Sequence, residues 1–272
     1  MPVCLDQIVA ATRRKLAETR ASGDLARLER KAEKHVPRGF RRALQTASKN
    51  GVAVIAELKK ASPSRGLIRA NFDPEKLARE LEAFGAAALS VLTDAEFFQG
   101  SLENLRRASA SVRLPCLRKD FIVDEFQIVE ARANSADAIL LIVAALSQAE
   151  LTKLAKSASR WGLDVLCEVH DEEELGRAVD AGCKLIGVNN RDLRTFQVDL
   201  ETAIRLGEFI PKYAIRVAES GIHSGADISR LRAAGYQAFL IGESLMAAKS
   251  PGEALRTLVA EASTGYRVPS TE

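Results

Sequence analysis

From residue 51 onward, apolar and polar positions follow one repeating order. A short, nearly continuous apolar run is followed by a polar junction, a segment with helical periodicity, a glycine and the next apolar run. This order is typical of consecutive βα units. The eight apolar runs, which predict eight strands, are Val52–Glu57, Ala87–Leu92, Pro115–Leu117, Ala138–Val143, Leu163–Val169, Lys184–Val188, Ile215–Ala218 and Ala238–Ile241.

The segments between these runs predict helices that pack one face on a sheet. Leu77, Leu81 and Phe84 share a helical face, and similar pairs recur in later segments. Four glycines stand just before an apolar run, where a positive φ angle closes a helix and turns the chain into the next strand. These are Gly85, Gly162, Gly182 and Gly235.

The pattern predicts an α/β fold, a (β/α)8 TIM barrel with an N-terminal helical extension. Runs that are apolar throughout indicate strands buried on both faces, as in a parallel sheet covered by helices. A doubly wound open sheet is the competing architecture, but it normally shows a GxGxxG or P-loop turn after an early strand, and this sequence has neither. We therefore expect one domain over 1–272, divided into an extension (1–50), the barrel (51–262) and a tail (263–272).

The first 50 residues differ from the repeat. Leu5, Ile8, Val9 and Leu16 predict one amphipathic helix, and a strongly charged stretch follows from Arg27 to Arg42. The part from Arg27 to Lys34 is interpreted as a solvated helix face. We expect the extension to pack on the barrel.

Composition narrows the class of protein. The 272 residues are 47% hydrophobic and 28% charged, which is typical of a globular protein. The net charge of +3 comes from basic and acidic residues mixed along the chain, so a small anionic ligand is favoured over nucleic acid. The longest apolar run, Ala138 to Leu146, is too short to cross a bilayer and the N-terminus lacks an apolar signal core, so we predict a cytoplasmic protein without a membrane partner.

The cysteines do not indicate a metal or disulfide framework. They are widely spaced, with no CxxC pair and no histidine at metal-ligand spacing, and we expect reduced thiols and no metal site. The four are Cys4, Cys116, Cys167 and Cys183.

Charged and amide side chains follow five of the predicted strands. In a TIM barrel the C-terminal strand ends and the loops after them build the active site. Any one of these groups is explained as well by a structural salt bridge or a solvated loop, but their recurrence at the same place in the repeat favours a site. The five segments are Glu57-Leu58-Lys59, Arg118-Lys119-Asp120, Cys167-Glu168-Val169, Asn189-Asn190-Arg191 and Glu219-Ser220-Gly221.

These groups suit acid–base chemistry. Strand alternation places Glu57 and Lys59 on one side, which predicts an ion pair at the barrel mouth. Lys119 and Lys59 are the candidate acids, and Glu168 and Glu57 the candidate bases. Carboxylates and ammonium groups gathered in a partly desolvated mouth perturb one another's pKa values. Asn189 can orient a hydroxyl or carboxylate without titrating.

The last two strand ends predict a phosphate site. Ser220-Gly221 follows the seventh strand and Gly242-Glu243-Ser244 the eighth, the usual phosphate position of these barrels. Glycine allows backbone N–H groups to approach an anion, and the following helix directs its positive dipole end toward it. Either glycine alone is explained by a turn, whereas the pair favours phosphate. Glu243 is expected to contribute its backbone N–H only.

Weaker candidates lie in the loops. Arg65 and Lys60, around the Ser62–Gly66 loop, are placed to close over an anion, and a solvated turn without a role explains them equally well. His170 lies on the side of Glu168 and is a candidate for proton transfer, although a single loop histidine is more often a bystander. Phe98 and Phe121 are either rim packing or a clamp for an aromatic ring.

Seven motifs together resemble the indole-3-glycerol-phosphate synthase family, and the resemblance runs through the whole barrel and includes the long N-terminal extension. They are Ile55-Ala56-Glu57-Leu58-Lys59-Lys60-Ala61-Ser62-Pro63-Ser64, Ser90-Val91-Leu92-Thr93-Asp94, Leu117-Arg118-Lys119-Asp120-Phe121, Glu168-Val169-His170, Gly187-Val188-Asn189-Asn190-Arg191-Asp192-Leu193, Ala218-Glu219-Ser220-Gly221-Ile222 and Leu240-Ile241-Gly242-Glu243-Ser244-Leu245-Met246.

The resemblance implies a carbon–carbon lyase of tryptophan biosynthesis. The implied substrate is 1-(2-carboxyphenylamino)-1-deoxyribulose 5-phosphate, which closes a ring and loses carbon dioxide and water, with no metal or organic cofactor. Lys119 resembles the acid that protonates the substrate carbonyl. Lys59, paired with Glu57, resembles a group near the substrate carboxylate that serves the dehydration. Glu168 resembles the general base, or a group that stabilises positive charge on the aniline nitrogen.

The resemblance assigns the remaining positions to three groups: catalytic, substrate-binding and phosphate-binding. Asn189 and Ser220 complete the catalytic set, Ser220 also belonging to the phosphate site. Substrate-binding positions are Ser62, Phe98, Phe121, Arg191, Leu193 and Glu219, and phosphate-binding positions are Ser220, Gly221, Gly242 and Glu243. We expect this small molecule to be the partner of a monomer or weak homo-oligomer.

Two other functions fit the same barrel. One is a sugar-phosphate isomerase or epimerase that uses the same phosphate site. The other is a non-catalytic barrel that binds a phosphorylated metabolite or a partner enzyme.

Overall fold

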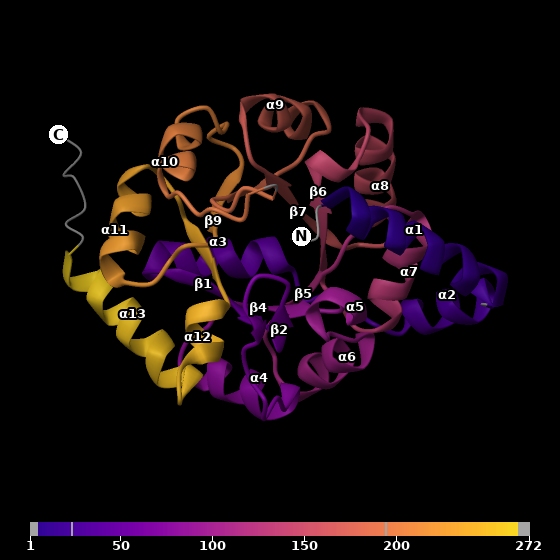
Figure 1. Cartoon of the computed structure of the whole chain (residues 1–272), viewed down its shortest axis with the longest axis horizontal. Helices are drawn as coiled ribbons and strands as arrows, with labels where there is room; N and C mark the ends of the chain where they lie inside the picture. The colour runs from indigo at the N-terminus through magenta and orange to yellow at the C-terminus, as the bar shows by residue number, and fades with distance from the viewer. Residues whose placement is uncertain (1–4, 23, 194, 266–272) are drawn as a thin grey trace.

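Eight parallel strands form a closed barrel in a computed structural model that describes residues 5–22, 24–193 and 195–265 (Figure 1). The strand order around the barrel is β1-β10-β9-β8-β7-β6-β5-β4. This confirms the predicted TIM barrel, and every predicted strand lies within two residues of an observed one. The strands are β1 (Ala53–Leu58), β4 (Ala88–Leu92), β5 (Cys116–Lys119), β6 (Ala138–Ile142), β7 (Asp164–Val169), β8 (Leu185–Asn189), β9 (Ile215–Glu219) and β10 (Ala238–Ile241).

Helices surround these strands (Figure 1). The predicted glycine joints are present, since Gly85, Gly162, Gly182 and Gly235 all have φ between 67° and 93°. The outer helices are α4 (Pro74–Ala83), α6 (Leu102–Ser111), α7 (Glu125–Ala133), α8 (Gln148–Arg160), α9 (Glu172–Asp180), α10 (Glu201–Gly207), α11 (Gly225–Ala233) and α13 (Pro251–Gly265), with short turns at α5 (Ala95–Phe98), η1 (Val143–Ala145) and α12 (Glu243–Ala247). Helix α13 extends past residue 262, the expected end of the barrel.

Alternate strand residues divide the core into two layers. Ile55, Leu117 and Leu166 belong to an inner cluster, whereas Val54 and Cys167 belong to the cluster between strands and helices. Burial on both faces explains why the strands are apolar throughout. At the C-terminal ends the inward positions become polar, so that Glu57, Lys119, Glu168, Asn189 and Glu219 continue the inner row of their own strands.

The N-terminal extension forms three helices rather than the single one expected. They are α1 (Leu5–Ser22), α2 (Leu25–Glu33) and α3 (Phe40–Asn50). Phe40 and Leu44 of α3 are fully buried in the inner cluster, against residues that begin the strands, so α3 closes the bottom of the barrel. Most of 27–34 is exposed as predicted, but Arg38, later in the charged stretch, hydrogen-bonds the buried carboxylate of Asp137.

The prediction that the cysteines are reduced thiols is wrong for Cys167 and Cys183. Cys167 of β7 and Cys183, two residues before β8, form a disulfide. They are 16 positions apart, and only the pairing of neighbouring strands brings them together. Cys116 is a buried free thiol, and Cys4 lies outside the described residues. Within the described ranges, no helix combines the length and apolarity needed to span a membrane.

Candidate active site

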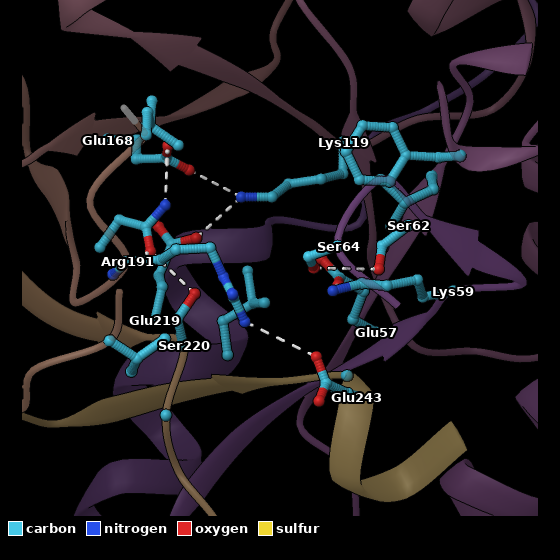
Figure 2. Close-up of a pocket in the computed structure, with 18 of the residues that line it drawn as sticks. Glu57, Lys59, Ser62, Ser64, Lys119, Glu168, Arg191, Glu219, Ser220 and Glu243 are labelled. Atoms are coloured by element: carbon cyan, nitrogen blue, oxygen red, sulfur yellow. Dashed lines mark hydrogen bonds and ion pairs between the residues drawn. The ribbon is translucent and has the colours of Figure 1, made fainter. Parts of the chain in front are cut away.

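One cavity opens at the C-terminal ends of the strands (Figure 2). Every residue singled out in the sequence as catalytic, substrate-binding or phosphate-binding lines it. These are Glu57, Lys59, Ser62, Phe98, Lys119, Phe121, Glu168, Asn189, Arg191, Leu193, Glu219, Ser220, Gly221, Gly242 and Glu243. Residues far apart in the chain therefore converge around one space.

Lys119 is the centre of the polar group in this cavity. Its Nζ lies 2.7 Å from Oε2 of Glu168 and 2.8 Å from Oε2 of Glu219, as the dashed lines in Figure 2 show. The Nδ2 group of Asn189 donates to Oε1 of Glu168 at 3.1 Å. The four side chains come from β5, β7, β8 and β9, so barrel closure itself assembles them.

The two carboxylates that share the ammonium of Lys119 have different pKa values. Burial raises the pKa of Glu219 to about 7, and the charges of Glu168 and Glu57 add to the rise while Lys119 opposes it. Burial also acts to raise the pKa of Glu168, but the charges of Lys119 and His170 outweigh it and bring that pKa to about 2. Glu168 therefore keeps its negative charge, and Glu219 takes up a proton more readily.

Lys119 remains protonated across the physiological range. Burial acts to lower the pKa of Lys119, but the carboxylates of Glu168, Glu219 and Glu57 raise it above its usual value. A charged donor that is only 15% exposed thus faces the cavity, and an electrostatic interaction at such a site is stronger than in bulk solvent.

A second ion pair lies at the C-terminal end of β1, as the alternation of the strand predicted. Nζ of Lys59 lies 2.8 Å from Oε1 of Glu57, and Ser90 Oγ donates to Oε2 of Glu57 at 3.3 Å. Leu58 packs on the opposite side, in the outer layer of the core. The absence of a side chain at Gly242 makes room for Glu57, since a Cβ there would lie 2.6 Å from its Oε1.

The loops after β9 and β10, where the sequence predicts a phosphate site, both line the cavity. Ser220 and Gly221 have φ of 66° and 75°, and Ser220 Oγ donates to Oδ1 of Asn189 at 2.8 Å. Glu243 begins α12, and its side chain pairs with two arginines, while the expected role of its backbone N–H stays a prediction. Its carboxylate accepts from Nε of Arg65 at 2.7 Å and lies 3.6 Å from Nη2 of Arg191.

An apolar wall faces these charges. The rings of Phe98 and Phe121 lie with centroids 6.2 Å apart, and Leu193 lines the same space. Leu5 and Ile8 of α1 complete the wall, a contribution that the sequence did not reveal. Their amphipathic pattern predicted a buried helix face, but nothing local indicated what that face would cover.

The loop after β1 folds into a short hairpin of β2 (Ala61–Ser62) and β3 (Gly66–Leu67). Ser62, Pro63 and Ser64 line the cavity, whereas Arg65 lies outside the lining and hydrogen-bonds the lining residue Glu243. Lys60 is not among the lining residues.

His170 lies just behind the cavity, next to Glu168 rather than in the lining. No group of three or more His, Cys, Asp or Glu side chains with metal-binding geometry occurs in the part of the chain that the structure describes. The site offers two ammonium groups, three buried carboxylates, two glycine-containing turns and an apolar wall.

Comparison with known proteins identifies relatives along almost the whole chain. The family model "Indole-3-glycerol phosphate synthase" matches residues 5–258. A Koribacter versatilis (strain Ellin345) protein with that description is 63% identical over 95% of this chain and 100% of the relative. A Chlorobium luteolum (strain DSM 273 / BCRC 81028 / 2530) protein of the same description is 52% identical over 90% of this chain and 94% of the relative.

A solved structure shares the fold at low identity. The thiamine phosphate pyrophosphorylase from Pyrococcus furiosus superimposes with a TM-score of 0.60 at 16% identity, covering 80% of this chain and 98% of that one. At that identity the likeness supports the barrel architecture alone.

Proposed function

Because the chain belongs to the indole-3-glycerol phosphate synthase family, and is thus a carboxy-lyase of tryptophan biosynthesis, we propose how its cavity performs that reaction. The proposed substrate is 1-(2-carboxyphenylamino)-1-deoxyribulose 5-phosphate. The observation that carries the assignment is the partly buried ammonium of Lys119, held by two carboxylates between an apolar wall and a pair of glycine turns.

The substrate has three parts that match three sides of the cavity. Its aromatic ring fits between Phe98, Phe121 and Leu193, and Leu5 and Ile8 cover it. Its phosphate lies at the backbone N–H groups of the Ser220-Gly221 and Gly242-Glu243 turns. Its carboxylate faces Lys59 and Arg191, with Ser62 on the adjacent loop.

Ring closure begins at Lys119. Its ammonium protonates the ribulose carbonyl oxygen while the ring carbon that bears the carboxylate attacks the carbonyl carbon. The aniline nitrogen then carries positive charge, which the ionised carboxylate of Glu168 stabilises. A preorganised charge of this kind typically lowers a barrier by about 3 kcal/mol.

Decarboxylation and dehydration complete the indole. The carbon–carboxylate bond breaks, carbon dioxide leaves, and its electron pair returns to the cationic ring system. Lys59, held by Glu57, protonates the departing hydroxyl group so that it leaves as water. Glu168 takes the last proton from the methylene carbon beside nitrogen, and Asn189 and Ser220, hydrogen-bonded to each other, orient the sugar hydroxyls.

These steps use side chains alone as acids and bases, so the proposal needs no cofactor. The lining of the cavity comes from one chain, from α1 to α12, and we propose that a monomer or weak homo-oligomer is active. A cytoplasmic location remains a prediction from the sequence.

Turnover of the anthranilate-derived ribulose phosphate by the purified protein tests the proposal. We expect indole absorbance and release of carbon dioxide. Lys119→Met and Glu168→Gln should each lower kcat by at least about 10²-fold, because a positioned proton donor or acceptor contributes that much. Lys184→Met, at an exposed lysine before β8, is the matched control and should leave kcat unchanged.

Two results would contradict the proposal. One is a wild-type protein that yields an isomerised sugar phosphate and no indole. The other is full activity in both Lys119→Met and Glu168→Gln.

A further inference from the structure

A line of three side chains runs from helix α9 to the rim of the cavity. Glu174 accepts a hydrogen bond from Nδ1 of His170 at 2.9 Å, and Nε2 of His170 lies 3.5 Å from Oε1 of Glu168. His170 is 15% exposed, Glu174 14% and Glu168 3%. The imidazole is therefore enclosed between two carboxylates, and only one of them faces the cavity.

The geometry fixes the orientation of the imidazole ring. Glu174 also accepts from the backbone N–H of His170 at 2.9 Å, so one carboxylate oxygen holds both the main chain and the ring. Nε2, at the opposite end of the ring, is buried and has no hydrogen-bond partner among the described residues. The carboxylate oxygen that lies 3.5 Å from Nε2 is Oε1 of Glu168, close enough for an ion pair.

The charges around His170 favour its protonated form. Glu168 on β7, Glu174 on α9 and Glu219 on β9 face it with negative charge, and Lys119 on β5 lies beyond Glu168. Burial acts to lower the pKa of His170, but the hydrogen bond to Glu174 and the charges of Glu168, Glu174 and Glu219 raise it above the ordinary 6.5.

We propose that His170, oriented by Glu174, is a positioning residue that holds the carboxylate of Glu168 in place and ionised for the proposed reaction. Glu168 then has three fixed neighbours: Lys119 and Asn189 on the cavity side, and an imidazolium behind. The inference rests on the proposed function only for the role of Glu168. The enclosure of the imidazole between two carboxylates is a property of the protein without substrate, so it is tested without turnover.

The first test measures protonation directly, without substrate. The chain has three histidines, so labelled histidine side chains give a simple NMR titration. We expect the pKa of His170 to lie above its ordinary value, and to fall in both Glu174→Gln and Glu168→Gln. Glu173→Gln is the matched control, because it changes an exposed glutamate of the same helix turn and should not move the pKa of His170.

The second test measures turnover across pH. Glutamine at position 174 can still accept from the backbone N–H of His170, so Glu174→Gln preserves the start of α9 and removes only the charge. We expect kcat to fall on the alkaline side as His170 loses its proton, and Glu174→Gln should move that limb to lower pH. His170→Asn, which carries no charge at any pH, should lower kcat about tenfold with little change in KM and should lack the His170 limb.

The outcomes separate this inference from the proposed function. If the wild-type protein fails to form indole, the proposed function fails, while the NMR titration still decides the state of His170. A pKa of His170 at or below the ordinary value would overturn the inference. So would His170→Asn with the kcat and the pH profile of the wild-type protein.

Discussion

At the residue scale, two glutamates contact the same ammonium, that of Lys119, but have different pKa values. Glu168 has Lys119, Asn189 and His170 around it, whereas Oε1 of Glu219 is buried with no hydrogen-bond partner among the described residues. An unpaired buried carboxylate oxygen is costly when charged and less so when protonated. Burial raises the pKa of Glu219, whereas the charges of Lys119 and His170, together with hydrogen bonds, lower that of Glu168, so one site holds a weak and a strong carboxylic acid together.

Glu219 should make the native protein less stable as the pH rises. Its pKa is raised from 4.5 to about 7, so its contribution to stability is fully present below the unfolded value and is lost as the pH rises through the folded one. Glu219→Gln removes that effect. Relative to wild type, the free energy of unfolding of the variant should increase by up to about 3 kcal/mol between pH 4.5 and pH 8, measured by urea denaturation.

A glycine makes room for that carboxylate. A Cβ at Gly187 of β8 would lie 2.1 Å from Oε1 of Glu219, so Gly187→Ala must displace the side chain from Lys119. We expect kcat to fall roughly 10-fold to 100-fold and stability to fall by about 1–3 kcal/mol, as overpacked sites do. Steady-state kinetics and urea denaturation check both numbers.

Gly176→Ala is the control for that substitution. Gly176 lies inside α9 with open space around its Cα, and alanine there should stabilise the helix by about 0.5–1 kcal/mol without affecting kcat. Equal effects of the two substitutions on kcat would count against a special role for Gly187.

At the scale of elements, the strands provide the site and the helices of the extension fix its surroundings. Helix α3 closes the barrel from below through Phe40 and Leu44. The loop before it is tied to the start of β6 by Asp137, a fully buried carboxylate that accepts from His35, from Arg38 and from the backbone N–H of Cys116. These contacts of Asp137 form the joint between the extension and the barrel.

Asp137→Asn should loosen the joint. Burial acts to raise the pKa of Asp137, but the hydrogen bonds from His35 and Arg38 and the charge of Arg38 lower it below the ordinary 3.8. The variant should lose about 3 kcal/mol of stability near neutral pH, because one partner of a buried ion pair loses its charge. The difference from wild type should shrink as the pH falls below 3.8 and through the lowered pKa.

Thermal or urea denaturation at several pH values measures this difference. Asp180→Asn, at an exposed carboxylate that ends α9, should leave stability unchanged. A pH-independent deficit in Asp137→Asn would show that the charge of this carboxylate is not what stabilises the joint.

At the scale of the whole molecule, the cavity unites the first described helix with the last strand. Leu5 and Ile8 of α1 face the same space as Gly242 and Glu243 after β10. Helix α1 is attached to the barrel by ion pairs of Arg13 with Glu150 and of Arg20 with Asp124, at 3.0 Å and 2.8 Å. These pairs are partly exposed, and such pairs contribute little stability each.

Removal of residues 1–22 should therefore affect binding more than chemistry. We expect KM to rise about tenfold, since an apolar side of the aromatic pocket is lost, whereas kcat changes less because Lys119, Glu168 and Lys59 lie on the strands or at their ends. Steady-state kinetics of the shortened protein measures both. A kcat that collapses while KM stays constant would place α1 in the catalytic step instead.

The sequence alone determined the architecture and which strand ends bring charged and amide groups to the cavity. Burial of parallel strands on both faces produces continuous apolar runs, and glycines mark the joints, so all eight strands were predictable. Alternation along a strand is also local, which is why the pair of Glu57 and Lys59 followed directly from their spacing.

Only the tertiary structure decided which of these groups meet. Barrel closure and helix docking bring together segments that are far apart in the chain. They produce the sharing of Lys119 by Glu168 and Glu219, the contact of Glu243 with Arg65, the disulfide of Cys167 with Cys183 and the position of Leu5 and Ile8. Such contacts depend on the stagger of neighbouring strands and on how the extension packs. No local pattern of apolar and polar residues encodes those distances.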